Sequence, residues 1–394
     1  MSFRTRRVLM TTPLIAIFEF FLMKYLFLLF GGLNDLYLLL LTVLFVLLNT
    51  VPMFFEEKKS RFITRTLDEI SGFWIWMSLF FFFDILFIYI IGAFVKLPFY
   101  LIVVLLLLVP IITIYSYWHA HRIIVHEKTI ELDKINQDIN IVHLSDVHFG
   151  AIRHKKIILD LRDKLNELSS TCDLAIISGD LADGSCVVEE DDFLPLKDVN
   201  IPIVFTAGNH DFYPGIENVY KACRKAGIII LDNEGMEFND LNIFGLTYSF
   251  GEIETVSLEE LKSFIKEDKV NIINFHVPQN WELFSGLGFD IQLSGHTHGG
   301  QFYPVVWIGN RIMYNMGLFK KSIGGKDRYL HVTTGVGSMD YPFRWGTDSE
   351  LVILKLRKKN YYYQFIIRYC FIIRYYCIVL LLSYLFKGFK WLKE

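Results

Sequence analysis

Basic residues are not in excess in this sequence. It contains 39 Lys and Arg against 42 Asp and Glu, which gives a formal net charge of −3, and its pI is about 6.4. A protein that binds nucleic acid needs basic surface to pair with phosphates. We therefore expect no nucleic-acid partner.

Cysteine is scarce, with five residues in 394 and no pair at CxxC spacing. This scarcity argues against a disulfide framework and against a zinc ribbon. The five thiols are expected to be free, in a reducing compartment. The sequence also has no internal repeat and no low-complexity linker.

Apolar sequence is abundant, and it is concentrated in the first third of the chain. Hydrophobic residues make up 53% of the sequence, and the mean hydropathy is +0.37. Four long apolar runs, each close to the roughly 20 residues that cross a bilayer as a helix, lie near residues 8–31, 36–55, 71–95 and 98–117. The first run is too long for a cleaved signal peptide, and three more follow it. We predict a four-span transmembrane domain over residues 1–120, with the lipid bilayer as its partner.

The charges that flank these runs predict an orientation. The basic residues before the first run and between the second and third are Arg4, Arg6, Arg7, Lys58, Lys59, Arg61 and Arg65. The positive-inside rule then puts the N-terminus, the middle loop and everything after residue 120 in the cytoplasm.

Ionisable residues inside the expected spans are costly unless they are paired. Lys24 is expected to pair with Glu19 or Asp84 and so hold the bundle together, although each of the three is also a functional candidate. Residues 361–394 form a hydrophobic C-terminal tail. Its apolar run at 364–386 is interrupted by two arginines and either lies in the membrane interface, which fits the charges better, or forms a fifth span.

From about residue 138 the pattern changes to that of a water-soluble domain. Short apolar runs near residues 139–144, 174–178, 201–206 and 270–275 are expected to be strands. Residues 155–168 have helical spacing with one apolar face, and Ser257 with Glu260 three residues later is a capping box. This alternation predicts an α/β domain over residues 138–357, with helices covering mixed β-sheets.

Residues that can bind metal follow the C-terminal ends of five expected strands, the edge where ligands bind in open α/β sheets. They are Asp146 and His148, Asp180, Asn209 with His210 and Asp211, His276, and His296 with His298. The other histidines are expected to be ordinary core or surface residues: His119, His121, His126, His143, His154 and His331.

Carboxylate oxygen and imidazole nitrogen together suit manganese, iron or zinc better than calcium. The two oxygens of Asp180 can bridge two ions. Two ions about 3.5–4 Å apart clamp a phosphate and lower the pKa of a bound water. The pattern therefore predicts two divalent metal ions and hydrolysis of a phosphoester.

The motifs DVH, GD, GNHD, an isolated H and GHTH, in this order, resemble the calcineurin-like metallophosphoesterase superfamily. The run GHTHGGQ at 295–301 and the stretch GVGSMDYPFRWGTDSELVILKL are similar to a branch of membrane-associated bacterial phosphoesterases. This branch includes a UDP-2,3-diacylglucosamine pyrophosphohydrolase of lipid A synthesis. The resemblance covers about residues 138–357 and leaves the spans and the tail unexplained.

The resemblance implies a role for each matching residue. One metal would be held by Asp146, His148 and His298, and the other by Asn209, His276 and His296, with Asp180 as the bridge. His210 would protonate the leaving oxygen or stabilise charge on the phosphate, and Asp211 would orient it by accepting its other ring proton. Arg344 would contact a phosphate of the substrate or be structural.

The sequence departs from this branch at two places. Val277 replaces the usual asparagine after the isolated histidine, and Tyr248 lies where many relatives have an acidic residue. The metal ligands are kept, but the second departure weakens any analogy of substrate.

The leading functional hypothesis is an enzyme of the bacterial inner membrane, with its catalytic domain in the cytoplasm. It would hydrolyse a phosphodiester or pyrophosphate bond in a lipid-linked substrate such as UDP-diacylglucosamine. The alternatives are a membrane receptor or transport module with a metal-binding sensor domain, and a tethered phosphodiesterase that acts on soluble nucleotides.

Overall fold

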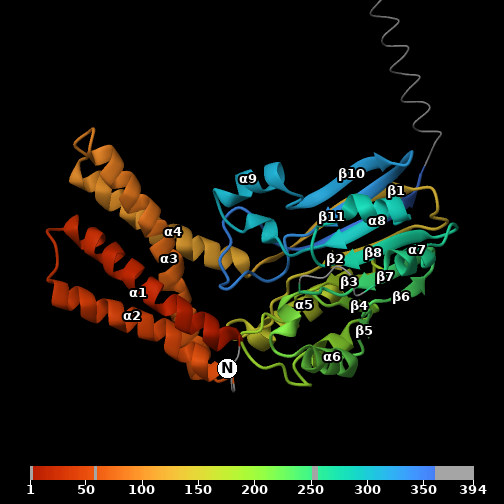
Figure 1. Cartoon of the computed structure of the whole chain (residues 1–394), viewed down its shortest axis with the longest axis horizontal. Helices are drawn as coiled ribbons and strands as arrows, with labels where there is room; N and C mark the ends of the chain where they lie inside the picture. The colour runs from red at the N-terminus through yellow and green to blue at the C-terminus, as the bar shows by residue number, and fades with distance from the viewer. Residues whose placement is uncertain (1–2, 57–59, 251–255, 360–394) are drawn as a thin grey trace, which may run out of the picture.

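The computed structural model describes residues 3–56, 60–250 and 256–359. The chain forms a bundle of long helices beside a layered α/β domain (Figure 1). The expected C-terminal run at 364–386, with Cys370 and Cys377, lies outside the described residues, and the other three cysteines are free as expected.

Four of the described helices are long and apolar enough to cross a membrane, by length and composition. They are α1 (Phe3–Leu28), α2 (Asp35–Glu56), α3 (Phe62–Gly92) and α4 (Phe99–Ala120). Large apolar side chains such as Leu14 and Ile111 point outward from this bundle and are more than half exposed. An apolar outer surface of this extent is typical of a surface that meets a membrane, which agrees with the predicted spans.

The polar contacts of the bundle differ from the predicted pairing. Lys24 lies 3.2 Å from Asp35 at the start of α2, and the carboxylate of Glu19 accepts a hydrogen bond of 2.9 Å from the indole N–H of Trp74. The predicted pairing of Lys24 with Glu19 or Asp84 is therefore wrong. Lys24 pairs with Asp35 instead, and Glu19 is bonded to Trp74.

The soluble domain is built on two six-stranded mixed sheets. In spatial order, the first sheet contains β1 (Ile123–Leu132), β12 (Ser349–Lys358), β2 (Ile139–Leu144), β3 (Leu174–Ser178), β4 (Ile203–Thr206) and β5 (Ile229–Ile230). The second contains β10 (Gly317–Ile323), β11 (Lys326–Val332), β9 (Ile291–Ser294), β8 (Val270–Phe275), β7 (Leu241–Leu246) and β6 (Glu234–Phe238). Strands β2 to β5 run parallel, as do β7, β8, β9 and β11.

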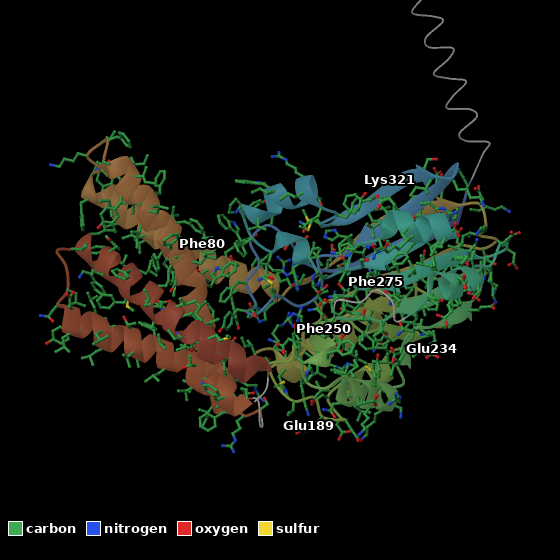
Figure 2. The ribbon with its side chains drawn as sticks, viewed as in Figure 1. Phe80, Glu189, Glu234, Phe250, Phe275 and Lys321 are labelled. Atoms are coloured by element: carbon green, nitrogen blue, oxygen red, sulfur yellow. The ribbon has the colours of Figure 1, made fainter. Side chains whose placement is uncertain are left out.

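The sheets pack face to face between two layers of helices (Figures 1 and 2). Because side chains alternate along a strand, Ile141 and Ile176 face the second sheet, whereas Val142 and Ala175 face the helices α5 (His154–Leu168) and α6 (Ile216–Lys225). The helices α7 (Leu258–Ser263) and α8 (Trp281–Leu287) cover the outer face of the second sheet. The capping box at Ser257 is confirmed. The helix α9 (Val305–Ile312) follows the last metal-binding motif.

Strand β1 lies ahead of residue 138, where the sequence pattern predicts the start of the soluble domain. It pairs in parallel with β12 from Ile123↔Ser349 to Leu132↔Lys358. The sheet therefore starts almost directly after α4 ends at Ala120. Helix α3 also begins before the expected span at 71, because its polar first turns carry no hydropathy signal.

Aromatic contacts join the soluble domain to the bundle. The ring of Phe343 stacks on Trp76 of α3 with centroids 5.0 Å apart, and the hydroxyl of Tyr341 accepts a 3.0 Å hydrogen bond from Asn49 of α2. The main-chain N–H of Arg344 donates to the carbonyl of Ser116 in α4 at 3.0 Å. The loop at 339–347 is thus fixed to three of the four helices.

Candidate metal centre

The predicted ligands converge at one edge of the two sheets. They occupy the loops that follow β2, β3 and β4 in the first sheet and β8 and β9 in the second. These strands are parallel within each sheet, so their C-terminal ends lie at a common edge. The five motifs, far apart in sequence, thereby form one cluster.

The backbone of this cluster is unusual. Several of its non-glycine residues have left-handed φ angles: Asp146 (49°), His148 (50°), Asp180 (54°), His296 (73°) and His298 (50°). Each such conformation costs free energy and persists where the surroundings enforce it, commonly at functional sites. Here the left-handed residues lie in turns that directly follow buried strands, and their backbone conformation sets the direction of the ligand side chains.

One half of the cluster joins the ends of β2 and β9. The Nε2 atoms of His148 and His298 lie 3.0 Å apart, and they are 3.7 Å and 3.4 Å from Oδ1 of Asp146. These three residues form a group whose ligand atoms could hold a metal ion. They are the three residues predicted for the first metal.

The other half joins the ends of β3, β8 and β9. Nε2 of His276 is 3.1 Å from Oδ2 of Asp180 and 3.2 Å from Nδ1 of His296, and this trio is a second possible metal group. Oδ2 of Asp180 also lies 3.9 Å from Nε2 of His148. Asp180 therefore contacts both halves, as a bridging ligand would.

Two buried oxygens in the cluster test whether cations fit there. Oδ1 of Asp146 and Oδ1 of Asn209 are buried and have no hydrogen-bond partner among the described residues. A buried acceptor without a partner is costly. Since neutral imidazole and carboxylate suit transition metals, the donor set fits divalent cations that would satisfy these oxygens.

The charges in the cluster favour ionised carboxylates. Burial by itself would raise the pKa of Asp180, but His276 outweighs it and lowers the pKa to about 2. In the same way, His298 and His148 hold the pKa of the buried Asp146 well below its usual value. Both side chains are therefore negative at neutral pH, as metal binding requires.

The imidazoles divide into two kinds. Burial lowers the pKa of His298 well below its usual value, and burial followed by the charge of His276 lowers that of His296 to about 4. Burial also acts against protonation of His276, but the Asp180 carboxylate outweighs it and raises its pKa to about 10. His276 must consequently lose a proton when a cation binds.

His210 lies beside the cluster, with its ring centroid 4.9 Å from that of His148. Its main-chain N–H donates to Oδ1 of Asp180 at 2.8 Å. Its Nδ1 is 3.0 Å from the carbonyl oxygen of Asp183. A carbonyl can only accept, so Nδ1 carries the proton and Nε2 remains for another partner.

Asp211 has a different role from the predicted one. Its buried carboxylate accepts main-chain hydrogen bonds from Asp180 (2.9 Å), Ala182 (2.8 Å) and Gly208 (2.8 Å). The predicted contact with the His210 ring is wrong, because the Asp183 carbonyl takes that place. Asp211 ties the loop after β3 to the loop after β4.

Arg344 is fully buried. Its guanidinium donates to the carbonyls of Thr334 and Gly337, at 2.6 Å each, and Nη2 lies 3.3 Å from Nδ1 of His298. This geometry does not support the predicted contact of Arg344 with substrate, because the guanidinium is buried against the ring of the predicted metal ligand His298. The burial agrees with the structural role that the sequence left open.

A buried polar network lies beneath the cluster. Nδ1 of His143 lies 2.6 Å from Nδ1 of His331, and its Nε2 lies 2.7 Å from the hydroxyl of Ser178. The Ser178 carbonyl in turn lies 2.7 Å from Nδ1 of His276, which directs Nε2 of that ring into the cluster. Both outer histidines are satisfied core residues, as expected, and no signal in the sequence links them to His276.

Comparison with known proteins connects this site to a family. The family model for calcineurin-like phosphoesterase matches residues 139–300, a range that includes all seven predicted ligands. An uncharacterized metallophosphoesterase of Helicobacter pylori is 29% identical over 243 residues, which are 60% of this chain and 64% of that protein. The match thus spans less than two thirds of the relative's length.

Two further relatives extend the comparison. The uncharacterized protein YpbG of Bacillus subtilis is 31% identical over 227 residues, which are 55% of this chain and 81% of that protein. A transmembrane protein with metallophosphoesterase domain from Danio rerio is 24% identical over 253 residues, which are 58% of this chain and 56% of that protein. The matched range and these relatives show that the chain carries a calcineurin-like phosphoesterase domain.

Proposed function

We propose that this protein is a membrane-anchored phosphoesterase that uses two divalent cations to hydrolyse a phosphodiester or pyrophosphate bond in a lipid-linked substrate. The observation that carries the proposal is that six predicted ligands lie in the candidate metal groups and that Asn209 follows β4 at the same edge, with unsatisfied buried oxygens on Asp146 and Asn209. Asp146, His148 and His298 would hold one cation, and Asn209, His276 and His296 the other. Asp180 would bridge them.

The cations, when bound, supply positive charge that clamps a phosphate and lowers the pKa of water. Manganese, iron and zinc all suit these ligands. His210 is held by the Asp183 carbonyl at Nδ1, so its Nε2 is free to donate a proton to the leaving oxygen when the ring is charged. Asp211 would act through the backbone of Asp180 rather than on the substrate.

The location of the edge supports a lipid-linked substrate. Arg344, which lies against His298, also hydrogen-bonds the main chain of α4. The metal cluster is therefore close to the end of the helical bundle. A site held at a membrane surface meets lipid-borne substrates at high effective concentration. A UDP-diacylglucosamine-type molecule is the specific candidate, by analogy with the GHTHGGQ branch.

Two finer assignments are part of the same proposal. On the charge pattern of the loops, the catalytic domain lies in the cytoplasm, at a bacterial inner membrane. The chain divides into a membrane domain (1–120), a catalytic domain and a hydrophobic tail (361–394), with the start of the catalytic domain moved from 138 to β1.

The metal centre can be tested on the full chain in neutral detergent, with added manganese and bis-p-nitrophenyl phosphate as substrate. We expect turnover that disappears in Asp180→Asn and survives in Asp163→Asn, a matched change of an exposed carboxylate on α5. Full activity in Asp180→Asn would disprove the bridging role. Metal binding without any turnover would favour the sensor hypothesis instead.

The lipid part needs a separate comparison. The full enzyme should cleave a diacylated nucleotide sugar with a higher kcat/KM than the same nucleotide sugar without acyl chains. Equal values would refute the lipid-linked substrate but leave the phosphoesterase intact. Lipid extracts of depleted cells, screened by mass spectrometry, should show the accumulating natural substrate.

A further inference from the structure

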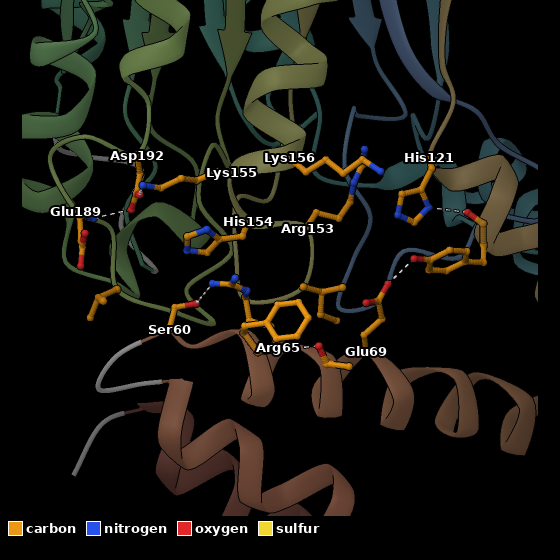
Figure 3. Close-up of a pocket in the computed structure, with 15 residues that line it drawn as sticks. Ser60, Arg65, Glu69, His121, Arg153, His154, Lys155, Lys156, Glu189 and Asp192 are labelled. Atoms are coloured by element: carbon orange, nitrogen blue, oxygen red, sulfur yellow. Dashed lines mark hydrogen bonds and ion pairs between the residues drawn. The ribbon is translucent and has the colours of Figure 1, made fainter.

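A cavity of about 780 Å³ lies where the helical bundle meets the soluble domain (Figure 3). Its walls are the start of α3, the end of α4, residues 152–156 at the start of α5, and the loop around 187–192. None of the seven predicted metal ligands lines it. The cavity is therefore a second site, distinct from the metal centre.

Basic side chains from both parts of the protein enter this cavity: Arg65 from α3, and Arg153, Lys155 and Lys156 from the soluble domain. Only two of them have acidic partners among the described residues. Lys155 lies 3.4 Å from Asp192, and Arg153 lies 3.3 Å from Asp160.

The other two basic groups lack a described counter-ion. Arg65 donates a 3.1 Å hydrogen bond to the hydroxyl of Ser60, and no ion pair of Lys156 is seen within residues 3–56, 60–250 and 256–359. Two positive groups are thus available for a ligand.

Acidic side chains also line the cavity, but most are engaged elsewhere. Glu69 accepts a hydrogen bond from the hydroxyl of Tyr117. Asp192 receives Lys155 and the main-chain N–H of Glu189. The carboxylate of Glu189 is solvent-exposed, and Figure 3 shows it beside Asp192, at the end of the cavity opposite His121.

The start of α5 adds further positive potential. The N-terminus of a helix carries partial positive charge and favours anions. This 15-residue helix has no side-chain cap and no acidic residue in its first turn, where Lys155 and Lys156 stand instead. Such an arrangement is unfavourable unless an anion compensates it.

A buried atom points to the same ligand independently. Arg153 is 8% exposed, and its buried Nε has no hydrogen-bond partner among the described residues. A buried N–H without an acceptor is costly. Because Arg153 lines the cavity, a ligand oxygen that reaches Nε would supply the missing acceptor.

The pKa values of the two histidines in the cavity are lowered, in part by its arginines. Burial, followed by the charge of Arg153, lowers the pKa of His121 to about 4. Burial, followed by the charge of Arg65, lowers the pKa of His154. Both rings are neutral at pH 7, so the positive charge of the cavity comes from its arginines and lysines.

We infer that this cavity binds a phosphate group, and that its ligand is the headgroup of an anionic phospholipid. Arginine and lysine are the residues that recognise phosphate. The cavity lies at the ends of α3 and α4, where a span meets the headgroups of the bilayer. Phe62 lines the cavity and is 75% exposed, so an acyl chain can lie beside it. Free phosphate has the same chemistry and is the other source to test.

The test uses the full chain in neutral detergent with EDTA, so that no phosphate binds through metals. Native mass spectrometry counts bound dioleoyl phosphatidylglycerol, and dioleoyl phosphatidylcholine serves as the zwitterionic comparison. We expect one tightly bound phosphatidylglycerol, weakened about 25-fold in Arg65→Gln/Lys156→Gln, because each of the two basic groups contributes a factor of about five near a lipid surface.

The control is Lys221→Gln/Lys326→Gln, which removes the same charge from two exposed lysines outside the cavity. Its affinity should stay within about twofold of the unchanged chain, since charges beyond a Debye length are screened. Lys156→Glu alone repeats the test at an exposed side chain, in case the double variant fails to fold.

Competition with millimolar inorganic phosphate separates the two sources. Displacement of the lipid means that free phosphate occupies the site as well, and retention means that the lipid headgroup is preferred. Equal phosphatidylglycerol affinity in the unchanged and variant chains would overturn the proposal, as would equally tight binding of phosphatidylcholine. Because EDTA is present throughout, this failure would leave the metal-centre proposal untouched.

Discussion

Replacement of Asp211 by alanine should weaken the fold and empty the metal centre together. The Asp211 carboxylate is the acceptor for three main-chain N–H groups, those of Asp180, Ala182 and Gly208. Two of these groups follow β3 and one follows β4, so one side chain fixes the loops that carry Asp180 and Asn209. In Asp211→Ala the three buried N–H groups lose their acceptor.

The expected loss of stability follows from the three N–H groups that lose their acceptor. Each unsatisfied buried donor costs about 1–3 kcal/mol. Water that enters the vacated space restores part of the bonding, so we expect a loss of about 3–5 kcal/mol in the free energy of unfolding. For a domain of 150–250 residues, 1 kcal/mol corresponds to about 2–4 °C in Tm. The Tm of Asp211→Ala should therefore fall by roughly 10 °C.

The assay is thermal unfolding of the full chain in detergent, followed by fluorescence, with bound manganese measured by elemental analysis. Asp211→Asn keeps one acceptor oxygen, so it should lose about half as much. The exposed Asp163→Asn is the control and should not change the Tm. An unchanged Tm with lost activity in Asp211→Ala would refute this reasoning and return Asp211 to a role in orienting His210.

Three further predictions concern the ligands and their supports. Arg344→Gln removes donors to two buried carbonyls and should lower the free energy of unfolding by about 2–4 kcal/mol; an unchanged Tm in thermal unfolding would contradict this. In the metal-free protein the pKa of His276 is about 10, so below that pH a cation must displace its proton, and calorimetry in two buffers should show manganese affinity that rises with pH and a released proton near pH 7. Affinity independent of pH would mean that His276 is neutral before binding. Phe343→Ala removes a fully buried ring stacked on Trp76 and should cost about 3–5 kcal/mol by thermal unfolding; a loss below 1 kcal/mol would show that this contact does not join the domains.

The strand-end motifs could be found from the sequence because each follows a short apolar run. Val270–Phe275 is fully buried along its length, and a run of this kind before His276 places the ligand at a strand end. Because neighbouring strands are parallel, their C-terminal ends lie at one edge of the sheet. The ligands can therefore be placed together without knowing any distance. The convergence of the ligand set was predictable for this reason.

Other features depend on contacts that no local pattern records. Strand β1 is half-exposed and carries His126, Glu127 and Lys128, so it lacks the apolar run of the inner strands. The partner of the His210 ring is a main-chain carbonyl, which any residue at 183 would supply. The burial of Arg344 depends on carbonyls from a loop that only the folded chain brings around it.

The pairing of β1 with β12 constrains how the protein can be divided. Only two residues separate the end of α4 at Ala120 from the start of β1 at Ile123, so the sheet cannot turn independently of the last span. A fragment cut at residue 138 would expose the ten-residue β12 as a bare edge, open to pairing with strands of other molecules. A soluble fragment that stays monomeric must therefore begin ahead of Ile123, within the polar end of the fourth helix.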